Sequence, residues 1–171
     1  MRKSHVYRKW IRLHGPQGEI VREKAVVDGG AMRNVADKKV WEKKKHRLGP
    51  LQQSTVVLKV ADNHPIRSEG CWSGEVEVAG VKTKTDFEII DTNGAFDLLL
   101  GKPWLRDVKA VHDYARDTIQ IQDETATTTI TNDDTHMTPK DDSEGWQHVK
   151  KSVSTTRAIT MTQQPKTHQN N

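Results

Sequence analysis

A single aspartate at the end of an apolar run is the most distinctive chemical feature of this sequence. The run Ala25–Val27 stops at Asp28, and Gly29, Gly30 and Ala31 follow. Glycine lacks a Cβ, so backbone N–H groups can approach a neighbouring carboxylate closely and stabilise its charge. A carboxylate held in this way can serve as a general acid or base.

Other chemistries find weaker support. The eight histidines and Cys71 do not show the spacing of a metal site, and we expect no metal and no cofactor. His112 and Asp113 are adjacent on a predicted strand, so they point to opposite sides and do not form a dyad. The basic run 38–47 suits the solvated face of an amphipathic helix better than an RNA site or a nuclear address.

Composition limits the class of protein. The chain has 171 residues, a net charge of +4 and 33% hydrophobic residues, which concentrates any core in part of the chain. Cys71 is the only cysteine, so an intrachain disulfide is impossible, as is usual in a reducing compartment. The N-terminus is basic without an apolar segment, and no apolar run is long enough to span a membrane. We therefore expect a cytoplasmic or nuclear protein that is not secreted and has no membrane partner.

The apolar pattern changes near residue 122. Residues 1–122 carry short alternating or continuous apolar runs, whereas 123–171 are rich in Thr, Asp, Lys, Gln and Asn. A segment of this composition buries too little apolar surface to offset chain entropy. We expect one domain over 1–122 and a disordered tail or linker over 123–171.

Short predicted strands position Asp28. Residues 5–15 alternate, and with 19–28 they form a hairpin around a Gly-Pro-Gln-Gly turn. A short helix follows, with Val35, Val40 and Trp41 on one face and Gly49-Pro50 at its end. Further strands are predicted over 54–60, 66–78 and 82–91, then an apolar run over 96–101, a short helix opened by Pro103, and a last strand or hairpin over 112–121. Many short strands with brief helices predict an all-β, barrel-like fold.

Four motifs in this order resemble a known family. They are VVDGGA at 26–31, LKVADNHPIRSEG at 58–70, VKTKTDFEII at 81–90 and FDLLLGKPWLR at 96–106. The sequence over about 5–122 resembles the retropepsins, the aspartic proteases of retroviruses and long-terminal-repeat retrotransposons. Within that family it looks most like the gypsy-type and fungal transposon-derived members.

The resemblance implies a closed-barrel acid-protease fold with one lobe per subunit and one or two short helices. It also implies a homodimer, because each chain supplies one catalytic aspartate, and a peptide or polyprotein substrate bound beneath a flap over about 55–72. The chain would be a fragment of such a polyprotein or a stand-alone descendant. The site residues that it implies are the catalytic Asp28, the active-site loop Gly29, Gly30 and Ala31, and the flap residues Ala61, Asp62, Asn63 and His64.

The motif departs from the family at one position. Family members usually have Asp-Thr-Gly or Asp-Ser-Gly, and Gly29 lacks the hydroxyl that braces the dimer there. This departure leaves an alternative open, a catalytically inactive retropepsin-like module for dimerisation or peptide binding. A third reading, a basic nucleic-acid-binding domain, rests on charge and the 38–47 run, and we do not expect a nucleic-acid partner.

Overall fold

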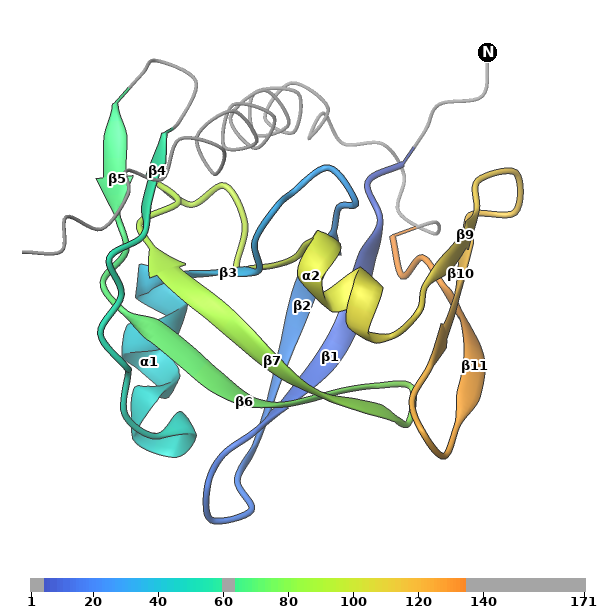
Figure 1. Ribbon diagram of the computed structural model, residues 1–171, viewed down its shortest axis with the longest axis horizontal. Coiled ribbons are helices and arrows are strands. Elements are labelled where there is room, and N and C mark those ends of the chain that lie inside the picture. The colour runs from blue at the N-terminus through green and yellow to red at the C-terminus, as the bar shows by residue number, and fades with distance from the viewer. Residues whose placement is uncertain (1–4, 60–63, 135–171) are drawn as a thin grey trace, which may run out of the picture.

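Six strands close into a barrel in the order β1-β2-β8-β3-β7-β6 (Figure 1). The computed structural model describes residues 5–59 and 64–134. The barrel strands are β1 (Arg8–His14), β2 (Ile20–Val27), β3 (Val35–Asp37), β6 (Cys71–Val78), β7 (Val81–Ile90) and β8 (Leu98–Leu100). With two helices beside it, this barrel confirms the all-β prediction.

The first two strands form the predicted hairpin. β1 pairs antiparallel with β2 over its whole length, from Arg8 opposite Val26 to His14 opposite Ile20. On β1, Ile11 and Leu13 are buried while Trp10 is exposed, as the alternating sequence predicts. This alternation places one face of the hairpin inside the barrel.

The short strand β8 lies between β2 and β3. It runs parallel to β2, with Val27 opposite Leu100, and antiparallel to β3, with Val35 opposite Leu99. All three leucines of β8 are buried, as expected of a strand covered on both faces. The chain between β2 and β3 therefore has to loop over the end of β8.

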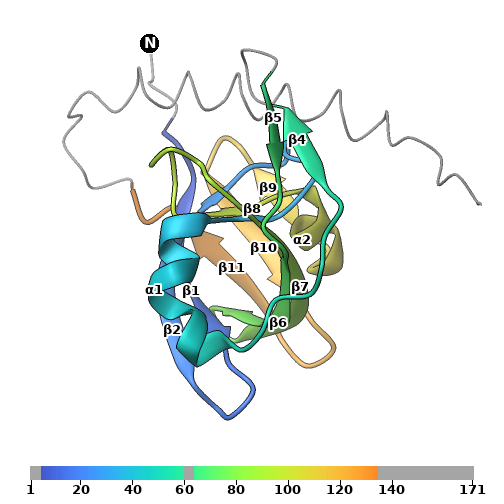
Figure 2. The same ribbon diagram turned by 90° about the vertical axis from the view of Figure 1, so that its left-hand side faces the viewer.

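Helix α1 (Lys38–Leu48) lies along one side of the barrel (Figure 2). The carboxylate of Asp37 caps it by accepting the Lys39 N–H, and Gly49 ends it with φ 90°. Trp41 is buried on its inner face. The prediction that Val35 belongs to this helix was wrong, because the Asp37 cap starts the helix three residues later and leaves Val35 in β3.

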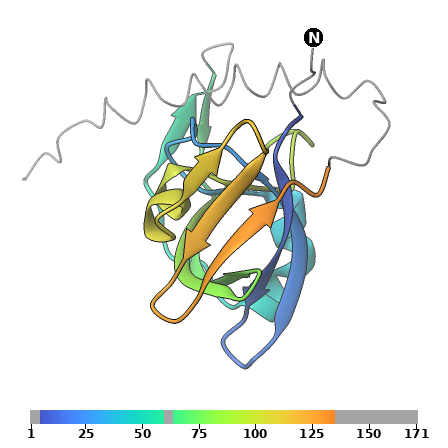
Figure 3. The same cartoon turned by 90° about the vertical axis from the view of Figure 1, so that its right-hand side faces the viewer.

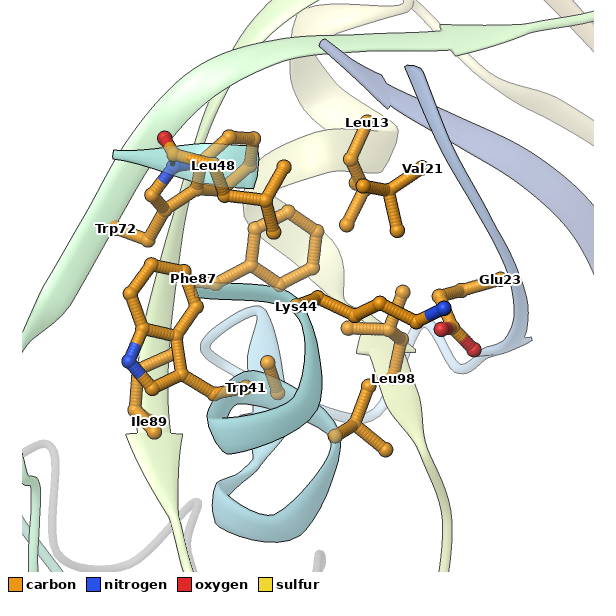
Figure 4. A pocket seen from close by; sticks show the side chains of 12 residues that line it. Leu13, Val21, Glu23, Trp41, Lys44, Leu48, Trp72, Phe87, Ile89 and Leu98 are labelled. Carbon is orange, nitrogen blue, oxygen red and sulfur yellow. Dashed lines mark hydrogen bonds between the residues drawn. The ribbon is translucent and has the colours of Figure 1, made fainter. Parts of the chain in front are cut away.

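A small apolar cavity lies between α1 and the barrel (Figure 4). Trp41, Trp72 and Phe87 lie around it, and Lys44 and Glu23 point toward each other at its edge. Its volume of about 10 Å³ is at the lower limit for one water molecule. This space is a packing gap in the core and not a ligand site.

A second hairpin projects from the barrel at the end where β2 leads into the loop toward β3 (Figures 1 and 2). It consists of β4 (Val57–Lys59) and β5 (Pro65–Arg67), paired antiparallel with Leu58 opposite Ile66. The strand predicted over 66–78 is in fact two strands. Gly70 has φ 155°, which breaks the extended chain between β5 and β6.

A three-stranded sheet completes the fold (Figure 3). After helix α2 (Lys102–Asp107) come β9 (Val111–Asp113), β10 (Thr118–Gln122) and β11 (Thr127–Thr131), in the order β11-β10-β9. The sheet crosses the boundary expected at residue 122. Ile130 is buried, and the Asn132 side chain binds the Val6 carbonyl, so residues 123–134 are part of the fold.

The expected boundary at residue 122 was too early because threonine is both weakly hydrophobic and a strand former. Its low hydrophobicity suggested a tail, but its β-branched side chain favours strands. Every residue of β11 pairs with β10, from Thr131 opposite Thr118 to Thr127 opposite Gln122. Residues 135–171, the rest of the expected tail, lie outside the described residues. No helix in the described ranges has the length and apolar character needed to cross a membrane.

Candidate active site

Asp28 directly follows β2, at the end of the barrel that carries the β4–β5 hairpin. Its backbone N–H donates to the Leu100 carbonyl at 3.0 Å, which extends the parallel pairing of β2 and β8 by one residue. Its side chain is half-buried, and the Gly30 N–H donates to its Oδ1 at 2.7 Å. The Ala31 N–H donates to the Asp28 carbonyl at 3.1 Å. The turn thus directs one backbone donor at the carboxylate, as the sequence suggested.

The Asp28 loop, defined here as residues 28–34, rests on the segment that follows β8. The Lys102 N–H donates to the Ala31 carbonyl at 2.7 Å, and the Gly101 N–H donates to Asn34 Oδ1 at 2.8 Å. A Cβ on Gly101 would stand 2.7 Å from the Ala31 carbonyl oxygen, too close for any side chain. Gly101, which the sequence marked merely as the end of an apolar run, is therefore needed for the loop to pack.

The two glycines after Asp28 differ in what they would tolerate. A Cβ on Gly29 would meet Leu105 Cδ1 at 3.6 Å, an ordinary contact, whereas a Cβ on Gly30 would stand 3.0 Å from Asp28 Oδ1. Neither glycine has a positive φ. The lack of a side chain at Gly30 thus lets its N–H approach the Asp28 carboxylate without a clash. At position 29 the backbone conformation would also suit other residues.

The β4–β5 hairpin and the Asp28 loop contribute apolar side chains to one buried cluster. Leu58 of β4 is 2% exposed and belongs to the same cluster as Ala31, with Val56 and Ile66 packed against it. Of the residues assigned to the flap tip, Ala61, Asp62 and Asn63 lie outside the described residues. His64 is described, and it is exposed just before β5.

Glu88 is a residue that the sequence reasoning missed. It lies in β7, is 8% exposed, and accepts hydrogen bonds from Ser54 and Ser68 on the two sides of the β4–β5 hairpin. Its other oxygen lies 4.0 Å from Arg33 Nη1 in the Asp28 loop. The available signal was one acidic residue inside the otherwise apolar run Phe87–Ile90.

The remaining chemistry of the described residues is limited. In the ranges 5–59 and 64–134, no group of three His, Cys, Asp or Glu side chains comes together in a metal-like cluster. Burial, followed by the negative charges of Glu88 and Asp86, raises the pKa of the Cys71 thiol, which disfavours a thiolate nucleophile. The ring of His112 stacks on Tyr114, and the Asp113 carboxylate accepts the Arg116 N–H. His112 and Asp113 therefore have separate partners and do not form a dyad.

The architecture is that of a retropepsin-like fold, a closed six-stranded barrel with short helices and an aspartate loop over its end. Among solved structures, the retroviral protease-like domain of Ddi1 from Leishmania major is similar, with a TM-score of 0.51 and 20% identity. The alignment covers 77% of this chain and 98% of that domain. No family model matches the sequence, and no curated protein matches it. The similarity thus concerns the fold, and the chemistry depends on the residues of the site itself.

Proposed function

We propose that two copies of this chain form an aspartic endopeptidase in which both Asp28 carboxylates share one site. The observation that carries the proposal is the Asp28 loop, where the Gly30 N–H binds Asp28 Oδ1 at 2.7 Å at the end of a buried strand. The sequence contains a single Asp-Gly-Gly motif, so a pair of such carboxylates requires a second chain. A two-fold axis beside the two loops would bring identical carboxylates together.

Two carboxylates in one site can divide acid and base roles between them. Like charges at close range cannot both ionise readily, so the pair shares one proton. The ionised carboxylate removes a proton from a bound water, and the resulting oxygen attacks the peptide carbonyl carbon. The protonated carboxylate donates to the carbonyl oxygen, and collapse of the tetrahedral intermediate breaks the C–N bond as the amine takes up a proton. No covalent enzyme intermediate forms.

The substrate class proposed is an extended peptide, within a polyprotein of the long-terminal-repeat retrotransposon type. Support comes from the order of the four sequence motifs and from the β4–β5 hairpin beside the Asp28 loop, where Leu58 and Ala31 share an apolar cluster. The single cysteine, Cys71, suits a reducing compartment and supports a cytoplasmic or nuclear location.

A second candidate is a catalytically inactive module that dimerises or binds extended peptides. Gly29 favours it, because glycine cannot supply the hydroxyl that braces the two loops in the family. The two candidates differ in their response to a pepstatin-type inhibitor, which mimics the tetrahedral transition state. An active enzyme is inhibited in cleavage, whereas the inactive module cleaves nothing with or without the inhibitor.

The proposed activity can be tested with a peptide library at mildly acidic pH. Wild-type protein is expected to cleave library members, and Asp28→Asn to cleave none while keeping the same circular dichroism spectrum and unfolding midpoint. The variant removes the base and changes little volume, so loss of activity with an intact fold is informative. Cleavage that survives in Asp28→Asn contradicts the proposal.

A further inference from the structure

The buried carboxylate of Glu88 joins both ends of the β4–β5 hairpin. Its Oε2 accepts the Ser54 hydroxyl at 2.7 Å and the Ser68 hydroxyl at 2.6 Å. Ser54 precedes β4 and Ser68 follows β5 by one residue. The Ser68 N–H also donates to the Val56 carbonyl at 2.9 Å. The two ends of the hairpin are therefore joined by this backbone bond and are both attached to one carboxylate oxygen of the barrel strand β7.

The same residue contacts the Asp28 loop. Glu88 Oε1 lies 4.0 Å from Arg33 Nη1, and the Glu88 N–H donates to the Asn34 carbonyl at 3.0 Å. Arg33 Nε is buried without a hydrogen-bond partner, and at 4.0 Å the guanidinium supplies positive charge to the Glu88 carboxylate and not a hydrogen bond. Glu88 thus lies between the hairpin that would cover a substrate and the loop that carries Asp28.

Burying a carboxylate lowers the stability of the folded protein unless other groups compensate the loss of hydration, so a side chain that only fills space would be apolar. Removing an ionised group from water is unfavourable unless hydrogen bonds and opposite charge compensate it. For Glu88 the compensating groups are two hydroxyls at the ends of the β4–β5 hairpin and one guanidinium of the Asp28 loop. An apolar residue would fit the neighbouring sequence, Phe87 and Ile89–Ile90, without this requirement.

We propose that Glu88 is a positioning residue that fixes the β4–β5 hairpin relative to the Asp28 loop. It acts through Ser54 and Ser68 on one side and through Arg33 on the other, and it does not contact the reacting atoms. The structural part of this inference is independent of catalysis. Its kinetic part rests on the proposed function.

Hydrogen exchange of the purified full chain tests the structural part. In Glu88→Gln the amide oxygen can take the place of Oε2 and accept both hydroxyls, but it carries no charge, and the amide N–H₂ then faces Arg33 in place of Oε1. We expect roughly tenfold faster exchange for amides of β4 and β5, because two charge-assisted hydrogen bonds become weaker neutral ones and the attraction to Arg33 is lost, with β10 and β11 unchanged. Glu69→Gln is the matched control, because Glu69 is exposed nearby and pairs with Lys38. It is expected to exchange as wild type does.

Substitutions at Ser54 test the same contact without altering the buried charge. Ser54→Ala removes the donor to Glu88 and also the acceptor of the Val56 N–H. It is expected to accelerate exchange in β5 as well as in β4, less than Glu88→Gln does, whereas loss of the Val56 bond alone would affect only the start of β4. Ser54→Thr keeps a hydroxyl and is expected to restore the wild-type rate. This pair carries the test if Glu88→Gln does not fold.

Two exchange results would overturn the inference. One is equal exchange in Glu88→Gln and Glu69→Gln, and the other is acceleration that extends equally to β10 and β11. With a cleaved peptide, Ser54→Ala should raise KM by roughly threefold while kcat changes less than twofold, because a smaller fraction of molecules has the hairpin placed for binding. A fall in kcat at constant KM would also contradict a positioning role. A wild type that cleaves nothing refutes the proposed function but leaves the exchange test of Glu88 in force.

Discussion

Replacing Gly29 with serine should tighten the proposed dimer. The Asp28 loop accepts the change, because a Cβ at position 29 meets Leu105 Cδ1 at an ordinary 3.6 Å and φ is not positive. Each chain gains one hydroxyl at the proposed two-fold axis, and a hydrogen bond contributes about 0.5–1.5 kcal/mol. Two symmetric bonds give about 1–3 kcal/mol, which corresponds to a dimer Kd lower by about 5- to 150-fold.

Sedimentation equilibrium over a range of concentrations measures this change directly. Gly30→Ser is the matched control, because its Cβ would stand 3.0 Å from Asp28 Oδ1 and crowd the carboxylate. That variant is expected to lose cleavage without tightening the dimer. A folded Gly29→Ser protein whose dimer Kd equals that of the wild type would refute the assignment of residue 29 to the subunit interface.

Three further predictions concern the frame around the site. Gly101→Ala should lower the unfolding free energy by about 1–3 kcal/mol in chemical denaturation, because its Cβ would overlap a carbonyl oxygen of the Asp28 loop at 2.6 Å. Truncation after Gln122 removes β11 and the buried Ile130, so it should lower the unfolding free energy by about 2–5 kcal/mol relative to truncation after Asp134, which keeps both. Equal midpoints for the two truncations would contradict the placement of β11. Backbone N–H groups of Lys82, Thr125 and Ala126 hold the pKa of Asp123 at about 2, below 3.8, so its stabilising effect is present above pH 4 and is lost as the pH falls toward 2. Asp123→Asn should flatten the stability curve over that interval, and an unchanged slope would show that these bonds are unimportant.

The local elements of the barrel could be predicted from the sequence. Alternation at Ile11 and Leu13 identified β1, and the apolar run over 96–101 marked a buried segment, which the structure shows to contain β8. The position of Asp28 at the end of a strand was also readable, because the apolar run Ala25–Val27 stops at it and two glycines follow.

Contacts between distant segments could not be predicted. Ser54, Ser68 and Glu88 are unremarkable as separate residues, and they meet because the β4–β5 hairpin closes beside β7. The strand β11 was missed for a different reason. Its threonines lower the mean hydropathy of the segment, while a single buried side chain, Ile130, together with full backbone pairing fixes it to β10.

The central claim is that catalysis requires Asp28 from two chains, and mixing experiments test it most directly. Wild-type and Asp28→Asn proteins are mixed at constant total concentration, allowed to exchange subunits, and assayed for peptide cleavage. If the active unit needs both carboxylates, activity falls as the square of the wild-type fraction, to about one quarter in an equal mixture. A linear fall, to about one half, would mean that each chain acts with its own Asp28 and would contradict the paired-aspartate account.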